Sequence, residues 1–365
     1  RGTRWQIAAL PFGGYVKFAG DADAASGKDV AAMEAVATDE AALRRTMHGA
    51  PLWARTATVA AGPIFNFALS ILIFAAVMLT SGVARDPLTV GEMRALPGAS
   101  TGLQNGDVIE AVAGVPVPSL DSPDYARFLT ELPQEPSLTY AVRRGADALV
   151  VEGPYLRPAL VATLAPQSAA IAAGLEVGDV ITGINGTPVF AFEQLKSAVE
   201  GSDGAPLALE VWRNGSVLEK TLQAKRVDEP QPEGGFATQW RIGVVGGMAF
   251  DPATTSPGVV AALSGAVAQV GRIINGTFNG VAHMITGAIS TCNLSGPIGI
   301  AQTSGEMASM GFDTFIWFIA VLSTAIGLFN LFPIPALDGG HLVFYAYEAI
   351  TGKPPSDGAL RILLA

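Results

Sequence analysis

The chain has 365 residues, of which 50% are apolar and 15% are charged, and its net charge is −10. This charged fraction is well below the ~25% of soluble proteins, which indicates membrane segments or an unusually large core. The acidic balance excludes the basic footprint of a nucleic-acid-binding protein. The single cysteine, Cys292, excludes an internal disulfide and a cysteine-based zinc cluster.

The first segment, residues 1–58, contains one strand-like pattern. The run Gly13-Gly14-Tyr15-Val16-Lys17-Phe18 alternates in the manner of an edge strand. With its flanking residues it predicts a β-hairpin at about residues 8–22. The pattern alone fits an ordinary surface hairpin as well as a functional one.

Two long apolar stretches lie on either side of the central polar region, one following the first segment and one near the end of the chain. Residues 59–84 and 313–335 each exceed the ~20 residues that a helix needs to cross a bilayer. Their central parts carry no charge, so we predict two transmembrane helices. Buried core helices are the alternative interpretation of both stretches.

The polar region between these stretches contains an internal repeat. Residues 97–117 and 166–189 share Gly-Leu, two further residues, Gly-Asp-Val-Ile, a turn of small residues and Pro-Val. The repeat resembles the bacterial form of the PDZ domain. The resemblance implies one PDZ domain at residues 85–155 and a second at residues 156–228.

The next region, residues 229–312, begins as a linker by composition and continues as a glycine-rich apolar segment. Glycine is tolerated in helices that pack within a membrane. We therefore expect membrane-associated helices at about residues 258–290, lying on or dipping into the bilayer. A third full span is the alternative.

Basic residues set the predicted topology, because cytoplasmic loops are enriched in Lys and Arg. Arg44, Arg45 and Arg55 precede the first span, whereas Lys353 and Arg361 follow the second. Both of these ends are therefore predicted to be cytoplasmic. The acidic repeat region between the spans is predicted to be extracytoplasmic.

The segment that ends the second apolar stretch carries an acid, Asp338. Asn330, Pro333 and Pro335 precede it, and two glycines follow it. An acid at membrane depth is costly, by at least ~2.5 kcal/mol, and is a functional candidate for that reason. Broken backbone at that depth must be buried in protein or line a cavity. The alternative is a helix end at the interface, where Asp338 caps the next helix.

The combination of motifs resembles the site-2 protease family, the M50-type intramembrane zinc metalloproteases. Asn-x-x-Pro-x-Pro-x-Leu-Asp-Gly-Gly at residues 330–340 resembles the third-ligand motif of that family. The other matching segments, in the order of the family, are residues 10–21, residues 51–55, residues 60–67, the tandem repeat and residues 294–299.

The resemblance implies a polytopic α-helical membrane protein with a membrane-associated β-hairpin and two inserted extracytoplasmic PDZ domains. It implies a Zn²⁺ ion held by Asp338 and by two histidines of a His-Glu-x-x-His helix, whose glutamate activates water. That motif does not occur in this sequence. We therefore expect a longer protein, with these residues upstream of Arg1 and with a last transmembrane helix that starts within residues 336–365.

The resemblance also implies a substrate-binding role for several residues. The hairpin edge at Gly13, Gly14, Tyr15 and Val16 would pair with an unwound substrate by β-addition. Asn330, which with Asp338 is a candidate catalytic residue, would bond to the extended substrate backbone near the scissile bond, and Pro333 and Pro335 would also contact the substrate.

Two residues of the first span and the three histidines are left with open or minor roles. Gly62 and Asn66 either pack helices or support the active site. His341 lies three residues after Asp338, on the same helical face, but the resembled family does not use that position as a ligand. We expect His48 at the surface and His283 in an interfacial or packing role.

The resemblance implies an intramembrane zinc endopeptidase in a bacterial inner membrane, with its active site towards the cytoplasm. Its substrates would be single-span membrane proteins, such as an anti-sigma factor already trimmed outside, and no ligand of the PDZ domains is implied. A catalytically inactive membrane scaffold that binds extracytoplasmic tails through its PDZ domains is the alternative. A serine protease of the HtrA type is a third, weaker alternative, because it needs a Ser-His-Asp set in a soluble domain.

Overall fold

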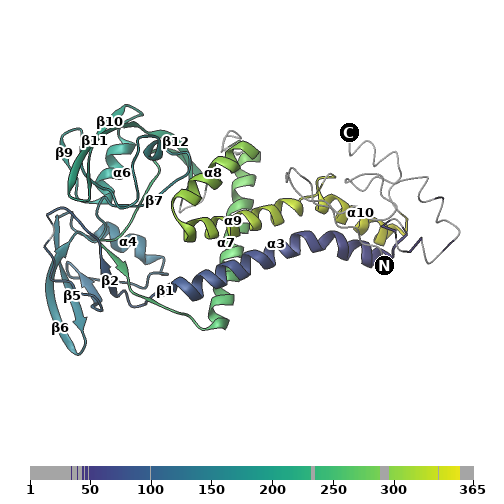
Figure 1. Cartoon of the computed structure of the whole chain (residues 1–365), viewed down its shortest axis with the longest axis horizontal. Helices are drawn as coiled ribbons and strands as arrows, with labels where there is room; N and C mark the ends of the chain where they lie inside the picture. The colour runs from purple at the N-terminus through teal and green to yellow at the C-terminus, as the bar shows by residue number, and fades with distance from the viewer. Residues whose placement is uncertain are drawn as a thin grey trace. The chain divides into compact units, whose positions relative to one another are not determined.

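The computed structural model describes residues 34, 39, 43–44, 46–47, 49–98, 100–231, 235–287, 296–335 and 337–353; Figure 1 shows their elements. The chain divides into two compact units. The first unit combines Arg1–Ser70 with Leu322–Ala365, and the second contains Ile71–Val321. The expectation of a protein that mixes helices and strands is confirmed. The predicted hairpin at residues 8–22 lies outside the described residues.

Among the described residues, three helices are long and apolar enough to cross a membrane. They are α3 (Leu52–Ser81), α7 (Val259–Ile285) and α9 (Phe312–Asn330). In their most apolar windows only 17%, 17% and 28% of the residues are buried inside the protein, so most of the apolar surface is exposed. Instead of several short helices, the glycine-rich segment forms one continuous helix, because no proline interrupts it. Its length fits the alternative of a third span.

The ends of the two predicted spans need correction. The helix predicted at residues 59–84 begins at Leu52, directly after Pro51, a residue suited to helix starts. It ends at Ser81 because Gly82 has a φ of +77°, a conformation that commonly terminates helices. The helix predicted at residues 313–335 ends at Asn330, because Pro333 disfavours helical backbone in the residues before it.

The two sequence repeats form two four-stranded antiparallel sheets of the same topology. The first has the order β4-β3-β5-β6 and the second the order β9-β8-β10-β11. The strands of the first are β3 (Val108–Val112), β4 (Val115–Pro116), β5 (Ser137–Arg144) and β6 (Asp147–Pro154). Those of the second are β8 (Val180–Ile184), β9 (Thr187–Pro188), β10 (Pro206–Arg213) and β11 (Ser216–Gln223). One helix follows the second strand of each sheet, α4 (Asp124–Glu131) or α6 (Phe192–Glu200).

The Gly-Asp pair of the repeat has the same structural role in both copies. Asp107 is fully buried and accepts two hydrogen bonds, both of 2.8 Å, from the guanidinium of Arg144. Asp179 accepts the equivalent bonds from Arg213, at 2.6 and 2.7 Å. Each aspartate also accepts a backbone N–H from its own turn, at 2.9 or 2.8 Å. The repeated motif therefore encodes a buried ion pair that closes the turn onto the third strand.

Each repeat has its own hydrophobic core. In the first, Phe128 of α4 is packed with Ile109, Tyr140 and Val142 of the sheet. The corresponding core of the second repeat contains Leu195 and Val199 of α6. The helix in each copy therefore covers its sheet through apolar side chains, as the amphipathic sequence of α6 predicts.

Residues 225–255 do not form the linker predicted to begin at residue 229; they return to the repeats. β12 (Lys225–Pro230) pairs with β13 (Phe236–Arg241). Three further pairs join this segment to earlier strands: β14 (Val244–Gly246) with β7 (Val161–Leu164), β15 (Phe250–Pro252) with β2 (Val90–Met93), and β16 (Thr254–Thr255) with β1 (Val83–Ala84). Composition alone could not reveal the last three pairings, because their partners are far apart in the sequence.

The described part of the second unit also contains the shorter helices α5 (Ala169–Ala172) and α8 (Pro297–Ser309). The backbone N–H of Gln167 donates to Glu306 Oε2 at 2.7 Å, and its side-chain amide donates to the carbonyl of Gly299 at 3.1 Å. The loop before α5 is therefore bound to α8.

Candidate functional site

The candidate site lies in the first unit, where α9 stops and a tight turn leads into α10 (Asp338–Thr351). Short-range hydrogen bonds shape the turn: Ile334 N–H donates to Phe332 O at 2.7 Å, and Leu337 N–H donates to Ile334 O at 2.9 Å. Pro333 and Pro335 have no N–H to donate, so an α-helical ladder cannot continue through them. Asp338 is consequently placed in the first turn of a new helix.

Gly339 and Gly340 allow this turn to fold back onto the start of α10. A Cβ atom on Gly339 would collide with the backbone carbonyl oxygens of Leu331 and Phe332. One on Gly340 would collide with Ile334 O and would lie 2.6 Å from Pro335 Cα. Both glycines are buried, and their obstacles are main-chain atoms that cannot rotate away. The two glycines after Asp338 are therefore required for close backbone approach.

The carboxylate of Asp338 lies against Gly62 of α3. A Cβ atom built on Gly62 would be 3.1 Å from Asp338 Oδ2, a closer contact than most real Cβ atoms make. The absence of a side chain at residue 62 leaves room beside the carboxylate. The sequence left the role of Gly62 open between helix packing and support of the site, and its contact with Asp338 favours support.

Asn66, one turn further along α3, lies at the contact with α9. Ser323 Oγ donates to the backbone carbonyl of Asn66 at 3.0 Å and lies 3.3 Å from Asn66 Oδ1. A Cβ atom on Gly327 would be 3.0 Å from Asn66 Cβ, so the two helices approach closely at this glycine. Asn66 therefore helps to join α3 to the helix that leads into the Asp338 turn.

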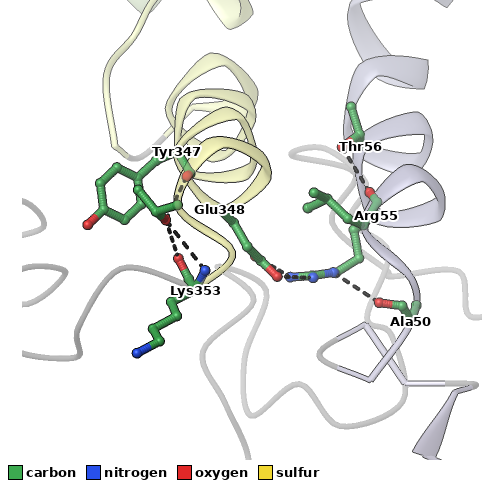
Figure 2. A network of polar contacts seen from close by, with 8 residues as sticks. Ala50, Arg55, Thr56, Tyr347, Glu348 and Lys353 are labelled. Atoms are coloured by element: carbon green, nitrogen blue, oxygen red, sulfur yellow. Dashed lines mark hydrogen bonds and ion pairs between the residues drawn. The ribbon is translucent and has the colours of Figure 1, made fainter.

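An ion pair joins the beginning of α3 to α10 (Figure 2). The guanidinium of Arg55 donates two hydrogen bonds to the carboxylate of Glu348, at 2.6 and 3.0 Å, and a third to the carbonyl of Ala50 at 3.1 Å. Its Cζ atom also lies 5.2 Å from the centre of the Tyr345 ring. Sequence reasoning missed Glu348, although a charged residue within an apolar helix is a usable signal.

The remaining predicted residues fall in two groups. The hairpin residues Gly13, Gly14, Tyr15 and Val16 lie outside the described residues, as does His48. Asn330 is the last residue of α9, and Pro333 and Pro335 lie in the turn before Asp338. The structure thus groups these three near Asp338 in the first unit.

The two described histidines have different surroundings. His341 follows Asp338 within the first turn of α10, and its ring centre is 6.3 Å from that of Phe344. His283 Nδ1 lies 2.7 Å from the carbonyl of Asn279, one turn earlier in α7, and its ring is 4.8 Å from Phe236. His283 is therefore engaged in packing and a local hydrogen bond, as expected.

Asp338 fits a zinc site as one ligand among several. Carboxylate oxygens bind zinc, and a catalytic site uses three protein ligands. Among the described residues, no group of three His, Cys, Asp or Glu side chains is close enough to hold a metal ion. The donor chemistry of Asp338 suits a metal, whereas the described residues do not complete its coordination.

A separate groove lies on the second repeat, between α6 and β14. It has a volume of about 420 Å³ and includes Leu195 and Val199 of the helix and Ile242 and Val244 beside them. Cationic and acidic side chains border it: Arg157, Glu193, Lys196, Glu229 and Arg241. Among the described strands, β14 pairs with β7 alone, so its other edge faces the groove.

The first repeat has an equivalent groove, of about 440 Å³, between α4 and β15. Tyr125 lines it, and the hydroxyl of Tyr125 is buried without a hydrogen-bond partner in the described part of the protein. Arg157 and Gly246 line both grooves. The two grooves therefore meet at the junction of the repeats.

These features define a membrane protein that combines apolar helices, a tandem β-repeat and a carboxylate on a broken helix. The model of peptidase family M50 matches residues 1–365, and the chain belongs to this family. A protein of Agrobacterium fabrum named "putative zinc metalloprotease" is 35% identical over 99% of this chain and 77% of its own length.

Two other relatives carry the same description. One, of Rhizobium meliloti, is 33% identical over 98% of this chain and 76% of its own length. The other, of Vibrio cholerae, is 31% identical over 97% of this chain and 81% of its own length. The sequence-based assignment to the site-2 protease family is thereby confirmed.

Proposed function

We propose that this chain forms part of an intramembrane zinc endopeptidase that cuts single-span membrane proteins. The observation that carries the proposal is the placement of Asp338 at the start of α10, after a helix broken by two prolines and beside Gly62. An acid held in this way next to a membrane-length helix is a functional group by default. The names of the relatives support zinc as the metal.

In this proposal Asp338 supplies one oxygen ligand to the metal, and two further protein ligands complete its set of three. A zinc ion contributes Lewis-acid polarisation of the scissile carbonyl and an activated water nucleophile. Asn330 offers an amide to the backbone of an extended substrate. Pro333 and Pro335 keep the preceding turn non-helical, so that its backbone can face the substrate.

The predicted hairpin would contribute the other half of substrate binding. A transmembrane substrate must leave its helical form before a protease can cut it, and it then needs new hydrogen-bond partners. The edge at Gly13, Gly14, Tyr15 and Val16 would supply them by β-addition. This role rests on the sequence alone.

We also propose that the two repeats are PDZ domains that face the extracytoplasmic side of a bacterial inner membrane. Their shared topology and the two grooves, each beside a strand that pairs with a single neighbour among the described strands, support this assignment. A strand edge next to an apolar groove binds extended peptides by β-addition. The pair would engage the tails of trimmed substrates, for example an anti-sigma factor, or limit the size of what enters.

The test is Asp338→Asn in the full-length protein, assayed on a model single-span substrate in membranes. We expect cleavage to be abolished and bound zinc to fall, while protease protection of the helices stays unchanged. Cleavage at the wild-type rate would remove Asp338 from the site.

The alternative is a catalytically inactive membrane scaffold that binds tails through the same two grooves. The grooves alone favour it as much as the protease. Metal analysis separates the two: the scaffold predicts purified protein with no zinc and no difference between wild type and Asp338→Asn.

A further inference from the structure

We propose that Arg55 and Glu348 are positioning residues, which set the position of Asp338 relative to Gly62 by fastening α10 to α3. This inference rests on the proposed function for its catalytic consequence. Its geometric part concerns the first unit alone and can be measured without any proteolysis.

Helix α10 contacts α3 at two separate points. Asp338 in its first turn lies against Gly62, and Glu348 near its other end binds Arg55. Ten residues of α-helix span about 15 Å, so the two contacts are well separated. Their order is opposite in the two helices, and α10 therefore runs antiparallel to the start of α3.

Both contacts lie on one face of each helix. Arg55 and Gly62 are seven residues apart, as are Asp338 and Tyr345, and such residues lie on the same side of an α-helix. The guanidinium of Arg55 stacks on the Tyr345 ring while it binds Glu348. A single side chain thus contacts α10 at two positions, which fixes the rotation of α10 as well as its distance.

The ion pair between Arg55 and Glu348 is well shielded and has a specific geometry. The side chains of Arg55 and Glu348 are only 15% and 18% exposed even without lipid. The fork of an arginine matches a carboxylate with two parallel hydrogen bonds, a geometry that lysine cannot reproduce. The third bond of the guanidinium, to the carbonyl of Ala50, fixes the arginine itself (Figure 2).

The contact between Gly62 and Asp338 differs from this ion pair. At that point α3 offers a glycine without a side chain, so no side-chain bond from residue 62 can hold the carboxylate in place. The position of Asp338 must then come from the elements around it. Among the described residues, the Arg55–Glu348 pair is the ion pair that joins α10 to α3.

The activity arm uses Arg55→Lys and Glu348→Gln in the full-length protein with a single-span model substrate. We expect kcat to fall about 10- to 100-fold, because small displacements of reacting groups have effects of this size. KM should change less than about twofold, since neither residue is placed at the substrate. The exchange of both charges, Arg55→Glu with Glu348→Arg, should recover part of the loss.

The geometric arm measures the Gly62–Asp338 contact directly. In a Cys292→Ser background, Gly62→Cys and Asp338→Cys are combined and cross-linked by mild oxidation in membranes. We expect efficient cross-linking with Arg55 present and a several-fold lower yield with Arg55→Lys or Glu348→Gln. Arg272→Lys, on α7, is the matched control, because the guanidinium of Arg272 bonds to Gln269 of its own helix.

The outcomes distinguish the two proposals. An unchanged cross-linking yield in both variants would overturn the positioning role, whatever the activity does. An inactive wild-type protein whose cross-linking still depends on Arg55 would overturn the proposed function and leave the positioning role intact. A loss of all cross-linking together with loss of protease protection in Arg55→Lys would show a folding defect, and it would contradict a specific role.

Discussion

Gly62 and Asp338 are 276 positions apart in the sequence, yet a Cβ atom on Gly62 would lie 3.1 Å from Asp338 Oδ2. The contact joins the first apolar helix to the start of the last described one. It brings together two motifs that the sequence presents separately, Ala-Ala-Gly-Pro and Leu-Asp-Gly-Gly. The candidate site is defined by this pair.

The first prediction concerns the close contact between Gly62 and the Asp338 carboxylate. Gly62→Ala should reduce cleavage of a single-span substrate about 10- to 100-fold, because the added Cβ must displace the Asp338 carboxylate. Gly271→Ala on α7 is the control, since a Cβ there meets nothing within 4 Å. Equal activity of both variants would show that the carboxylate tolerates displacement.

The second prediction concerns the glycine pair after Asp338. Gly339→Ala should destabilise the first unit by about 3 kcal/mol, because its Cβ would collide with two backbone carbonyls. Protease protection of α10 in membranes measures the effect. Gly305→Ala on α8, where the added atom meets open space, should leave protection unchanged or improve it. Full protection in Gly339→Ala would mean that the turn has other conformations available.

The third prediction concerns acid stability of the first repeat. The guanidinium of Arg144 beside Asp107 holds the pKa of that carboxyl below its usual value. A folded-state pKa below the unfolded one stabilises the fold above the unfolded pKa of ~3.9, and this contribution is lost as the pH falls through the folded pKa. Wild-type β3–β6 should therefore lose amide-exchange protection as the pH falls below about 4.

Asp107→Asn separates this charge effect from general acid damage. At neutral pH it should lower the thermal midpoint of the repeat by roughly 4–8 °C, because charge-assisted bonds to Arg144 are lost. Its protection should also depend less on pH in the acid range than that of the wild type. A wild-type pH profile in the variant would show that another group controls acid unfolding.

The fourth prediction concerns the groove of the second repeat. Lys196 is exposed and borders this groove. Lys196→Glu should weaken binding of a trimmed substrate tail about threefold to fivefold, because it repels the new terminal carboxylate. Arg143→Glu, on β5 outside both grooves, is the control. The measurement is the affinity of a tail peptide for the full-length protein, and identical effects of both variants would exclude the groove.

The sequence determined the class of the protein because its signals are local. The uncharged stretch before Ser81, the Asn330–Gly340 motif and the Gly-Asp repeat can each be read within about twenty residues. Family membership follows from these motifs and is confirmed over residues 1–365. The predicted helix ends were less accurate. Pro333 ends α9 before the proline itself, and Gly82 ends α3 through its left-handed backbone conformation.

The tertiary structure decided what depends on distant partners. Strands β14, β15 and β16 pair with strands far earlier in the chain, whereas the composition indicated a linker from residue 229. The partner of Arg55 could not be chosen from the sequence, because the pair joins residues of two different helices. Asp338 is a conspicuous acid in the sequence, but only the packing of α3 and α10 places it against a residue without a side chain. Local patterns are set by backbone and side-chain preferences, whereas the site depends on which helices meet.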